Sequence, residues 1–229
     1  MRDIAKISLL FVFGTLFSCF HKPSTLSAQK SNIDSIFSNP VYTETFESID
    51  QNQLERDWLQ AITGKNVKGK WEIINENGNK SVGQVSDKSS GYLFNLIVLK
   101  KLSLKNLAIT ASVKAIAGKE DQGGGVVWRY QDSANYYVAR VNPLENNFRV
   151  YKVINGNREQ IQSYSLPVTA KEWHDITVVQ RDSLIECYFD HQLFLKATDN
   201  AINLPGKVGF WTKADAQTHF DNFMVKELK

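Results

Sequence analysis

From Pro40 onward, the chain consists of short runs of β-branched and aromatic residues that alternate with turn residues. Runs such as KWEII, GVVWRY, NYYVARV, FRVYKVI and KVGFWTK recur, separated by short segments such as QDSA, NPLENN and NGN. This pattern is typical of sequential antiparallel strands. The Asn155-Gly156 pair predicts a tight hairpin turn, because these residues tolerate a positive φ. We therefore expect an all-β domain, a two-sheet antiparallel jelly-roll sandwich.

One segment departs from the strand pattern, and the tryptophans indicate where the core lies. The segment SIDQNQLERDWLQAI carries a short apolar stripe at Leu54, Trp58 and Ile62, which has helical spacing. The chain has 229 residues, 42% of them hydrophobic, which is enough for one sizeable core. Trp128, Trp173 and Trp211 stand in or beside strand-like runs with apolar neighbours, so we expect all three in that core.

The N-terminus reads as a targeting segment. Residues 1–18 combine the basic Arg2 and Lys6 with an apolar stretch too short to span a membrane, so they predict a signal peptide. The stretch Leu16-Phe17-Ser18-Cys19 resembles a bacterial lipobox, which predicts a lipid on Cys19. Ordinary cleavage near Ala28 is the alternative. Residues 19–39, rich in Ser, Lys and Asn, predict a flexible tether, and residues 40–229 the folded domain.

This N-terminal pattern predicts a protein of the bacterial cell envelope. With lipid on Cys19, it would be anchored to a membrane and face the periplasm; without lipid, it would be secreted. Cys187 would then have no disulfide partner, and its place in the alternating run LIECYFD predicts a small buried hydrophobe. The sequence contains no zinc-site spacing.

Charge gives no case for nucleic acid as a partner. Lys and Arg total 27 and Asp and Glu total 24, for a net charge of +3, and no long run of like charge occurs. The glycine run DQGGGV precedes a strand-like run and not a helix, so it is not a phosphate-binding loop. Its glycines predict a bulge or a close approach of two backbones.

Residues 122–223 carry a family resemblance. The segments GGGVVWRYQDSANYYVARVNPLENNFRVYKVINGNRE, EWHDITVVQRD and GKVGFWTKADAQTHFDNF resemble the family 16 glycoside hydrolase-like, or 3-keto-disaccharide hydrolase-like, domain. The resemblance implies the concanavalin A-like sandwich of lectins and glucanases, and a glycan as the partner. A laminin-G-like adhesion module, which binds a protein, is the alternative on the same fold.

Catalytic residues are not assigned by this resemblance. Family 16 enzymes carry Glu-x-Asp-x-x-Glu on one strand, and this spacing does not occur in the chain. Retaining hydrolysis needs two carboxyl groups about 5–5.5 Å apart. Carboxylates from different strands can still converge, so the sequence leaves open whether the protein is an enzyme.

Polar residues inside the strand-like runs are the candidates for a glycan groove. Aromatic rings stack on sugar rings, while Arg and Asn side chains donate hydrogen bonds to hydroxyl groups. In the alternative interpretation, the arginines pair with carboxylates such as Asp132 and Glu145. The predicted groove residues are Arg129, Tyr137, Arg140, Asn142, Asn147, Arg149 and Lys213.

A structural calcium ion is the one cofactor that the sequence suggests. Sandwiches of the resembled kind often bind calcium where the first and last strands meet. Asp221 lies between Phe220 and Phe223, where a carboxylate is costly unless it is paired. Glu44 and Glu47 on the first strand can reach the same place. The alternative is that Asp221 caps a turn by accepting backbone N–H bonds.

Overall fold

The computed structural model describes residues 33–65 and 67–229, and it shows an all-β sandwich of two antiparallel sheets, as predicted. The predicted signal peptide and the predicted lipidation site, Cys19, lie outside the described residues. The elements are β1 (Tyr42–Glu44), α2 (Gln51–Asp57), β2 (Trp58–Thr63), β3 (Trp71–Glu76), β4 (Asn79–Gln84), β5 (Phe94–Leu99), β6 (Leu107–Ala117), β7 (Gly124–Asp132), β8 (Asn135–Asn142), β9 (Asn147–Ile154), β10 (Asn157–Ser165), β11 (His174–Arg181), β12 (Leu184–Phe189), β13 (Gln192–Thr198), β14 (Lys207–Lys213) and β15 (Gln217–Glu227).

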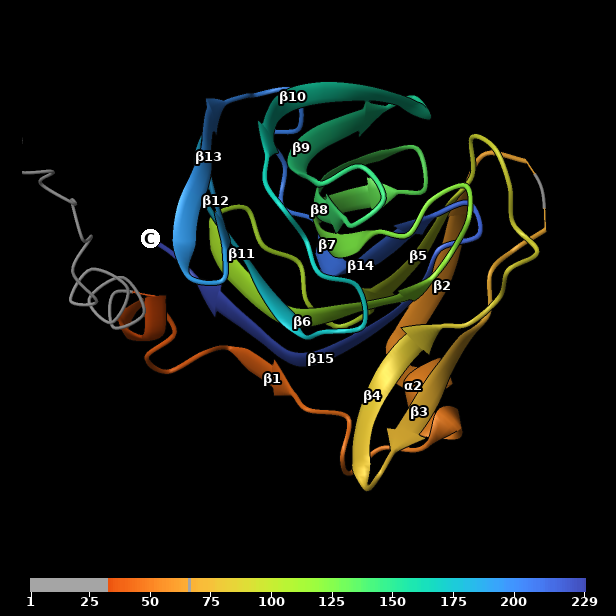
Figure 1. The fold of residues 1–229 in the computed structure, drawn as a ribbon. Helices are drawn as coiled ribbons and strands as arrows, with labels where there is room; N and C mark the ends of the chain where they lie inside the picture. Colours follow the sequence, from red (N-terminus) through yellow and green to blue (C-terminus); the bar gives the residue numbers. More distant parts are fainter. Residues whose placement is uncertain (1–32, 66) are drawn as a thin grey trace, which may run out of the picture.

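The two sheets form two layers of the sandwich (Figure 1). The first sheet has the order β13-β12-β11-β6-β15-β4-β3, and β1 pairs with β15. The second sheet has the order β10-β9-β8-β7-β14-β5-β2. In Figure 1 the first sheet curves around the second, and β10 lies at the far edge of the second sheet, next to β13.

The core lies between the sheets, but the second sheet is buried on both faces. On β5, Ile97 and Leu99 face the shared core, whereas Leu96 and Val98 belong to a separate apolar cluster. Tyr151 of β9 and Trp211 of β14 are in this second cluster, on the same sheet. The outer face of the second sheet therefore has a packed floor of its own.

The helix and two of the three tryptophans follow the prediction. Asp50 caps α2 by accepting a hydrogen bond from the Gln53 amide at 2.7 Å, but the helix ends at Asp57 and the rest of the apolar stripe is strand β2. Trp128 and Trp211 are fully buried. The prediction for Trp173 is wrong: its side chain is 38% exposed, because it lies in the loop before β11.

Glycine and turn residues act as predicted. A Cβ on Gly125 would lie 1.9 Å from the Ala139 carbonyl oxygen of the neighbouring strand, so only glycine fits this close approach. Asn155 and Gly156 have φ values of 52° and 81° in the hairpin between β9 and β10. Cys187 is a free, buried thiol.

The residues just before β1 pack on the sandwich. Residues 33–36 form a helical turn, and Ile33 and Phe37 are buried against Ala108 and Val179 of the first sheet. The last part of the predicted tether is therefore in contact with the domain. Among the described residues, no helix has the length and apolar character needed to cross a membrane.

Candidate functional site

The outer face of the second sheet brings together most of the predicted groove residues. Strands β8 and β9 place Arg140 opposite Arg149 and Asn142 opposite Asn147. Lys213 projects from the same face of β14, two residues after Trp211. We call this set, together with Asp121 and Glu145, the arginine site.

Glu145 holds the two arginines together. It lies in the turn between β8 and β9, and its Oε2 accepts hydrogen bonds from Arg149 at 2.8 Å, Asn147 at 2.9 Å and Arg140 at 3.1 Å. Burial raises the pKa of Glu145, but the Asn147 hydrogen bond and the Arg140 charge outweigh it and lower this pKa to about 2. The Glu145 carboxylate is therefore ionised at neutral pH.

Asp121 is the second carboxylate of the arginine site, and it is fully buried. Its Oδ1 accepts a hydrogen bond from the Gly123 amide at 2.9 Å, while its Oδ2 has no hydrogen-bond partner and lies 3.6 Å from the Lys213 ammonium. Burial raises the pKa of Asp121, and the Arg140 charge opposes this shift. The two carboxyl groups therefore have pKa values shifted in opposite directions.

Two further buried polar atoms of this site lack a protein partner. They are Nε of Arg140 and Nδ2 of Asn142, and both side chains are almost completely buried. Asn142 and Asp121 both approach Gly123, and the Asp121 charge acts on Arg140. Buried polar atoms without a partner are rare in folded proteins. Here two donors and one acceptor of this kind belong to residues of the arginine site.

Aromatic rings adjoin the arginine site. The Arg158 guanidinium of β10 lies 4.5 Å from the ring centre of Tyr151, 4.9 Å from Phe94 and 5.9 Å from Trp211. The Tyr151 hydroxyl accepts hydrogen bonds from both Arg140 and Arg149 at 3.3 Å. The site thus combines cationic donors with ring faces.

One side chain from a loop contributes to the cover over these rings. Tyr92, in the loop before β5, is 51% exposed, and its hydroxyl accepts a hydrogen bond from the Arg158 amide. Its ring lies 4.7 Å from that of Phe94. Tyr92 and Arg158 therefore meet above the aromatic end of the site.

Arg129 and Tyr137 lie elsewhere, contrary to the groove prediction. Arg129 has a φ of 46° in a bulge of β7, and its guanidinium donates to the carbonyl oxygens of Lys105, Asp182 and Ile202 at 2.7–2.8 Å. Tyr137 faces the shared core and stacks on Trp128 at 5.5 Å. The alternation of side chains along β8 explains the inward position of Tyr137, because the odd-numbered residues of this strand face the core.

The groove hypothesis and the alternative, in which the arginines pair with carboxylates, each agree with part of the structure. Arg140 and Arg149 lie on one face, as the groove hypothesis requires, and both pair with Glu145, as the alternative requires. Asp132 instead accepts hydrogen bonds from Asn135 and the Ala134 amide. The sequence analysis did not identify Asp121 and Arg158 as site residues, because their proximity to the site depends on the strand register.

The predicted calcium ligands are engaged with protein donors. Asp221 accepts hydrogen bonds from the Asn222 amide at 2.6 Å and from Asn79 at 3.3 Å. Glu44 accepts from the Phe46 amide and Glu47 from the Lys80 amide, each at 2.9 Å. No cluster of three or more His, Cys, Asp or Glu that could hold a metal ion occurs in the described ranges. The contact with the Asn222 amide is of the kind that the turn-capping alternative describes.

Calcium binding stays a prediction that thermal melting can test. An ion that binds only to the folded state must raise the midpoint of thermal unfolding. If Asp221, Glu44 and Glu47 only accept hydrogen bonds from protein donors, the midpoint is the same with added calcium and with chelator. A rise with calcium that Asp221→Asn abolishes would instead establish the site.

Comparison with known proteins finds one matching family model. The family model described as galactocerebrosidase, C-terminal lectin domain, matches residues 95–228, which is more than half of the chain. No curated protein matches the sequence. The matched family is not the one that the quoted segments resemble, so the finer family 16 assignment has no support.

Solved structures share the fold at low identity. The carbohydrate-binding module CBM66 from Bacillus subtilis is 20% identical, with a TM-score of 0.61 over 75% of this chain and 96% of that one. A protein of unknown function with a galectin-like fold, also from Bacillus subtilis, has a TM-score of 0.60 at 10% identity, over 83% and 96%. A xylan β-1,4-xylosidase from Bacillus halodurans is 13% identical, with a TM-score of 0.55 over 83% of this chain but only 40% of the xylosidase. At these identities the likeness shows the fold alone.

Proposed function

The chain belongs to the family of the galactocerebrosidase C-terminal lectin domain, and from this premise we propose that it binds a glycan at the arginine site. The similarity to a carbohydrate-binding module of the same fold supports the proposal. The observation that carries it is the group of buried polar atoms without partners, Oδ2 of Asp121, Nε of Arg140 and Nδ2 of Asn142.

These atoms suit the hydroxyl groups of a sugar. A hydroxyl both donates and accepts, so it can donate to the Asp121 carboxylate and accept from Arg140 or Asn142. Charge-assisted hydrogen bonds of this kind are about twice as strong as neutral ones. Arg149 and Lys213, with side chains 30% and 18% exposed, lie at the accessible rim. In this proposal the rim residues make the first contacts with the sugar, and the hydrogen bonds to the buried atoms determine which sugar binds.

A second candidate function is glycoside hydrolysis at the same place. Two carboxyl groups whose environments shift their pKa values apart are the usual pattern of an acid and its partner. Asp121, with a raised pKa, and Glu145, with a pKa near 2, form such a pair. Release of reducing sugar that stops in Asp121→Asn would support hydrolysis, whereas binding without release supports a lectin-like role.

Arg149→Ala is the sharpest test of glycan binding. Loss of one charge-assisted contact at the rim removes about 1.5–3 kcal/mol, so we expect the dissociation constant to rise about tenfold or more. The glycan is first identified on an array of plant, algal and bacterial oligosaccharides, and the affinity is then measured by titration calorimetry. Because Arg149 is partly exposed, the melting temperature should change little.

Arg56→Ala is the matched control, since Arg56 is exposed on α2, away from the second sheet's outer face. It should leave glycan affinity unchanged. An array on which the parent protein binds no glycan would refute the proposal. Binding to a protein partner that no glycan competes away would favour the adhesion alternative.

We also propose that the protein acts at the cell envelope, held to a membrane by lipid on Cys19. The support is the N-terminal sequence pattern alone. The sandwich would then present its glycan site to the periplasm at the end of the segment that precedes Ile33.

A further inference from the structure

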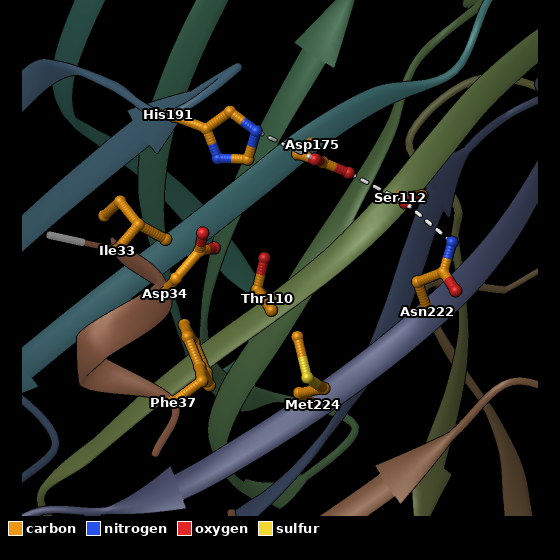
Figure 2. A pocket seen from close by; sticks show the side chains of 9 residues that line it. All are labelled: Ile33, Asp34, Phe37, Thr110, Ser112, Asp175, His191, Asn222 and Met224. Carbon is orange, nitrogen blue, oxygen red and sulfur yellow. Dashed lines mark hydrogen bonds and ion pairs between the residues drawn. The ribbon is translucent and has the colours of Figure 1, made fainter. Parts of the chain in front are cut away.

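The outer face of the first sheet carries two cavities that adjoin. One has a volume of about 460 Å³ and lies between residues 33–37 and the sheet (Figure 2). The other, of about 340 Å³, lies toward β3 and β4. Ser112 and Asn222 line both, so the two cavities share a wall, and we call them together the depression. Each volume is within the usual range for ligand pockets.

A β-bulge builds the shared wall. Asp221 pairs with Ser112 and Met224 with Thr110, so β15 has one residue more than β6 between these pairs. As a result, Phe220 and Phe223 both pack in the core, while Asp221 and Asn222 both line the outer cavity. Asn222 has a φ of 48°. Bulges of this kind re-aim side chains next to binding sites.

The wall continues as a chain of polar contacts. In Figure 2 Asn222 donates to the Ser112 hydroxyl at 3.2 Å, and Ser112 donates to Asp175 at 2.7 Å. Asp175 lies 3.4 Å from Nε2 of His191, whose Nδ1 is buried without a partner. Ile33, Phe37 and Met224 form the apolar side of the same cavity. The cavity therefore has one polar and one apolar wall.

Three residues that line the depression have a positive φ. His191, in the turn between β12 and β13, has a φ of 68°, and Asn77, in the turn between β3 and β4, has a φ of 56°. Together with Asn222, these residues line the two cavities. Non-glycine residues in this region of φ tend to gather at ligand sites.

Trp173 supplies an accessible ring at the end of the depression. It lines the smaller cavity together with Asn77, Asn79 and Asp221, and its side chain is 38% exposed. The Lys114 ammonium lies 5.6 Å from its ring centre and is paired with Glu76 at 2.7 Å. An exposed ring beside amide and carboxylate groups is the arrangement that stacks on a sugar and bonds its hydroxyls.

The charge around the depression is acidic. Asp34, Asp175 and Asp221 line the cavities with Glu76, whereas the basic groups near them are Lys114, His191 and His219. Since carboxylates repel uronic acids and sulfated sugars, an acidic ligand is disfavoured here.

We propose that this depression, the Trp173 groove, is a second glycan-binding site that takes a neutral oligosaccharide. It lies on the opposite sheet from the arginine site and does not depend on it. Trp173 stacks on one sugar ring, and Asn222, Ser112 and Asp175 bond the hydroxyls of the next.

Asn222→Gly tests the groove with little risk to the fold. Glycine adopts the positive φ of Asn222 without strain, so the bulge persists while the amide is lost. The probes are the neutral hexasaccharides cellohexaose, xylohexaose and laminarihexaose, measured by titration calorimetry, with hexagalacturonate as the acidic comparison. For the neutral probe that the parent binds at this site, we expect about a 3- to 10-fold weaker affinity. Trp173→Ala should weaken it by about 2- to 10-fold.

Asn155→Gly is the matched control. It is the same exchange at a φ of 52°, in the hairpin between β9 and β10, and it should leave the affinity unchanged. The groove is overturned if the parent binds none of the neutral hexasaccharides, or if Asn222→Gly and Trp173→Ala both keep its affinity. If Arg149→Ala alone abolishes all binding, the arginine site is the only binding site, and the proposal of the Trp173 groove is wrong. If Trp173→Ala alone abolishes all binding, the Trp173 groove is the only binding site, and the proposal of binding at the arginine site is wrong.

Discussion

Replacing Arg140 by Ala is expected to lower the free energy of unfolding by about 3–5 kcal/mol near neutral pH. The Arg140 side chain is 1% exposed and bonds Glu145, Asn147 and Tyr151. Its charge also acts on the buried Asp121 carboxylate, whose other cationic neighbour is Lys213, at 3.6 Å. Without Arg140, the negative charge of the buried Asp121 carboxylate loses a neighbouring positive charge. Glycan binding at the arginine site should be lost as well.

The pH dependence of this loss identifies its cause. Burial already raises the pKa of Asp121 in the folded protein, and removing the Arg140 charge raises it further. The folded variant then takes up a proton at a higher pH than the unfolded chain, whose Asp pKa is about 3.9. Its stability therefore increases as the pH falls through the folded-state pKa. The deficit relative to the parent should be smaller at about pH 5 than at about pH 8 in urea unfolding.

Asp121→Asn in the Arg140→Ala background is the control for this interpretation. It removes the buried charge while keeping the shape, so it should restore part of the lost stability and flatten the pH dependence. If the double variant is no more stable than Arg140→Ala at pH 8, Asp121 is not the source of the loss.

Replacing Arg129 by Ala is expected to cost about 3 kcal/mol or more without affecting the arginine site directly. Three carbonyl oxygens, those of Lys105, Asp182 and Ile202, would lose their donor. Each buried acceptor left unsatisfied costs about 1–3 kcal/mol, with water offsetting part of this at the more accessible oxygens. Urea unfolding measures the loss. Arg181→Ala, at an exposed position at the end of β11, is the control and should change stability little.

The Arg129 result also separates the two roles that the sequence assigned to one group of arginines. If folded Arg129→Ala keeps the parent's glycan affinity while it is destabilised, Arg129 is a structural residue. A large loss of affinity without a loss of stability would return Arg129 to the binding site.

Much of the fold was predictable because its signals are local. Alternation along NYYVARVN correctly placed Tyr136, Val138, Arg140 and Asn142 on one face and Tyr137 on the other. The Asn155-Gly156 turn followed from the φ values that these residues tolerate. Likewise, the close backbone approach at the glycine run followed from the missing side chain of Gly125.

The candidate sites were predictable only in part, because they are assembled across strands. Arg129 and Arg140 look alike in sequence, since each stands in an apolar strand-like run. A bulge in β7 directs Arg129 to three carbonyl oxygens, whereas the register of β8 and β9 sets Arg140 beside Arg149 and Glu145. Asp121 reads as a loop acid, yet the fold buries it beside Lys213 of β14.

By itself, the sequence determined that the chain folds as an antiparallel sandwich, since a period of two and turn chemistry are properties of neighbouring residues. Only the tertiary structure decided which polar side chains meet. It set Asp121 beside Arg140, exposed Trp173, and used the bulge in β15 to turn both Asp221 and Asn222 outward. These outcomes depend on strand register and on bulges, which are fixed by packing between residues far apart in the chain.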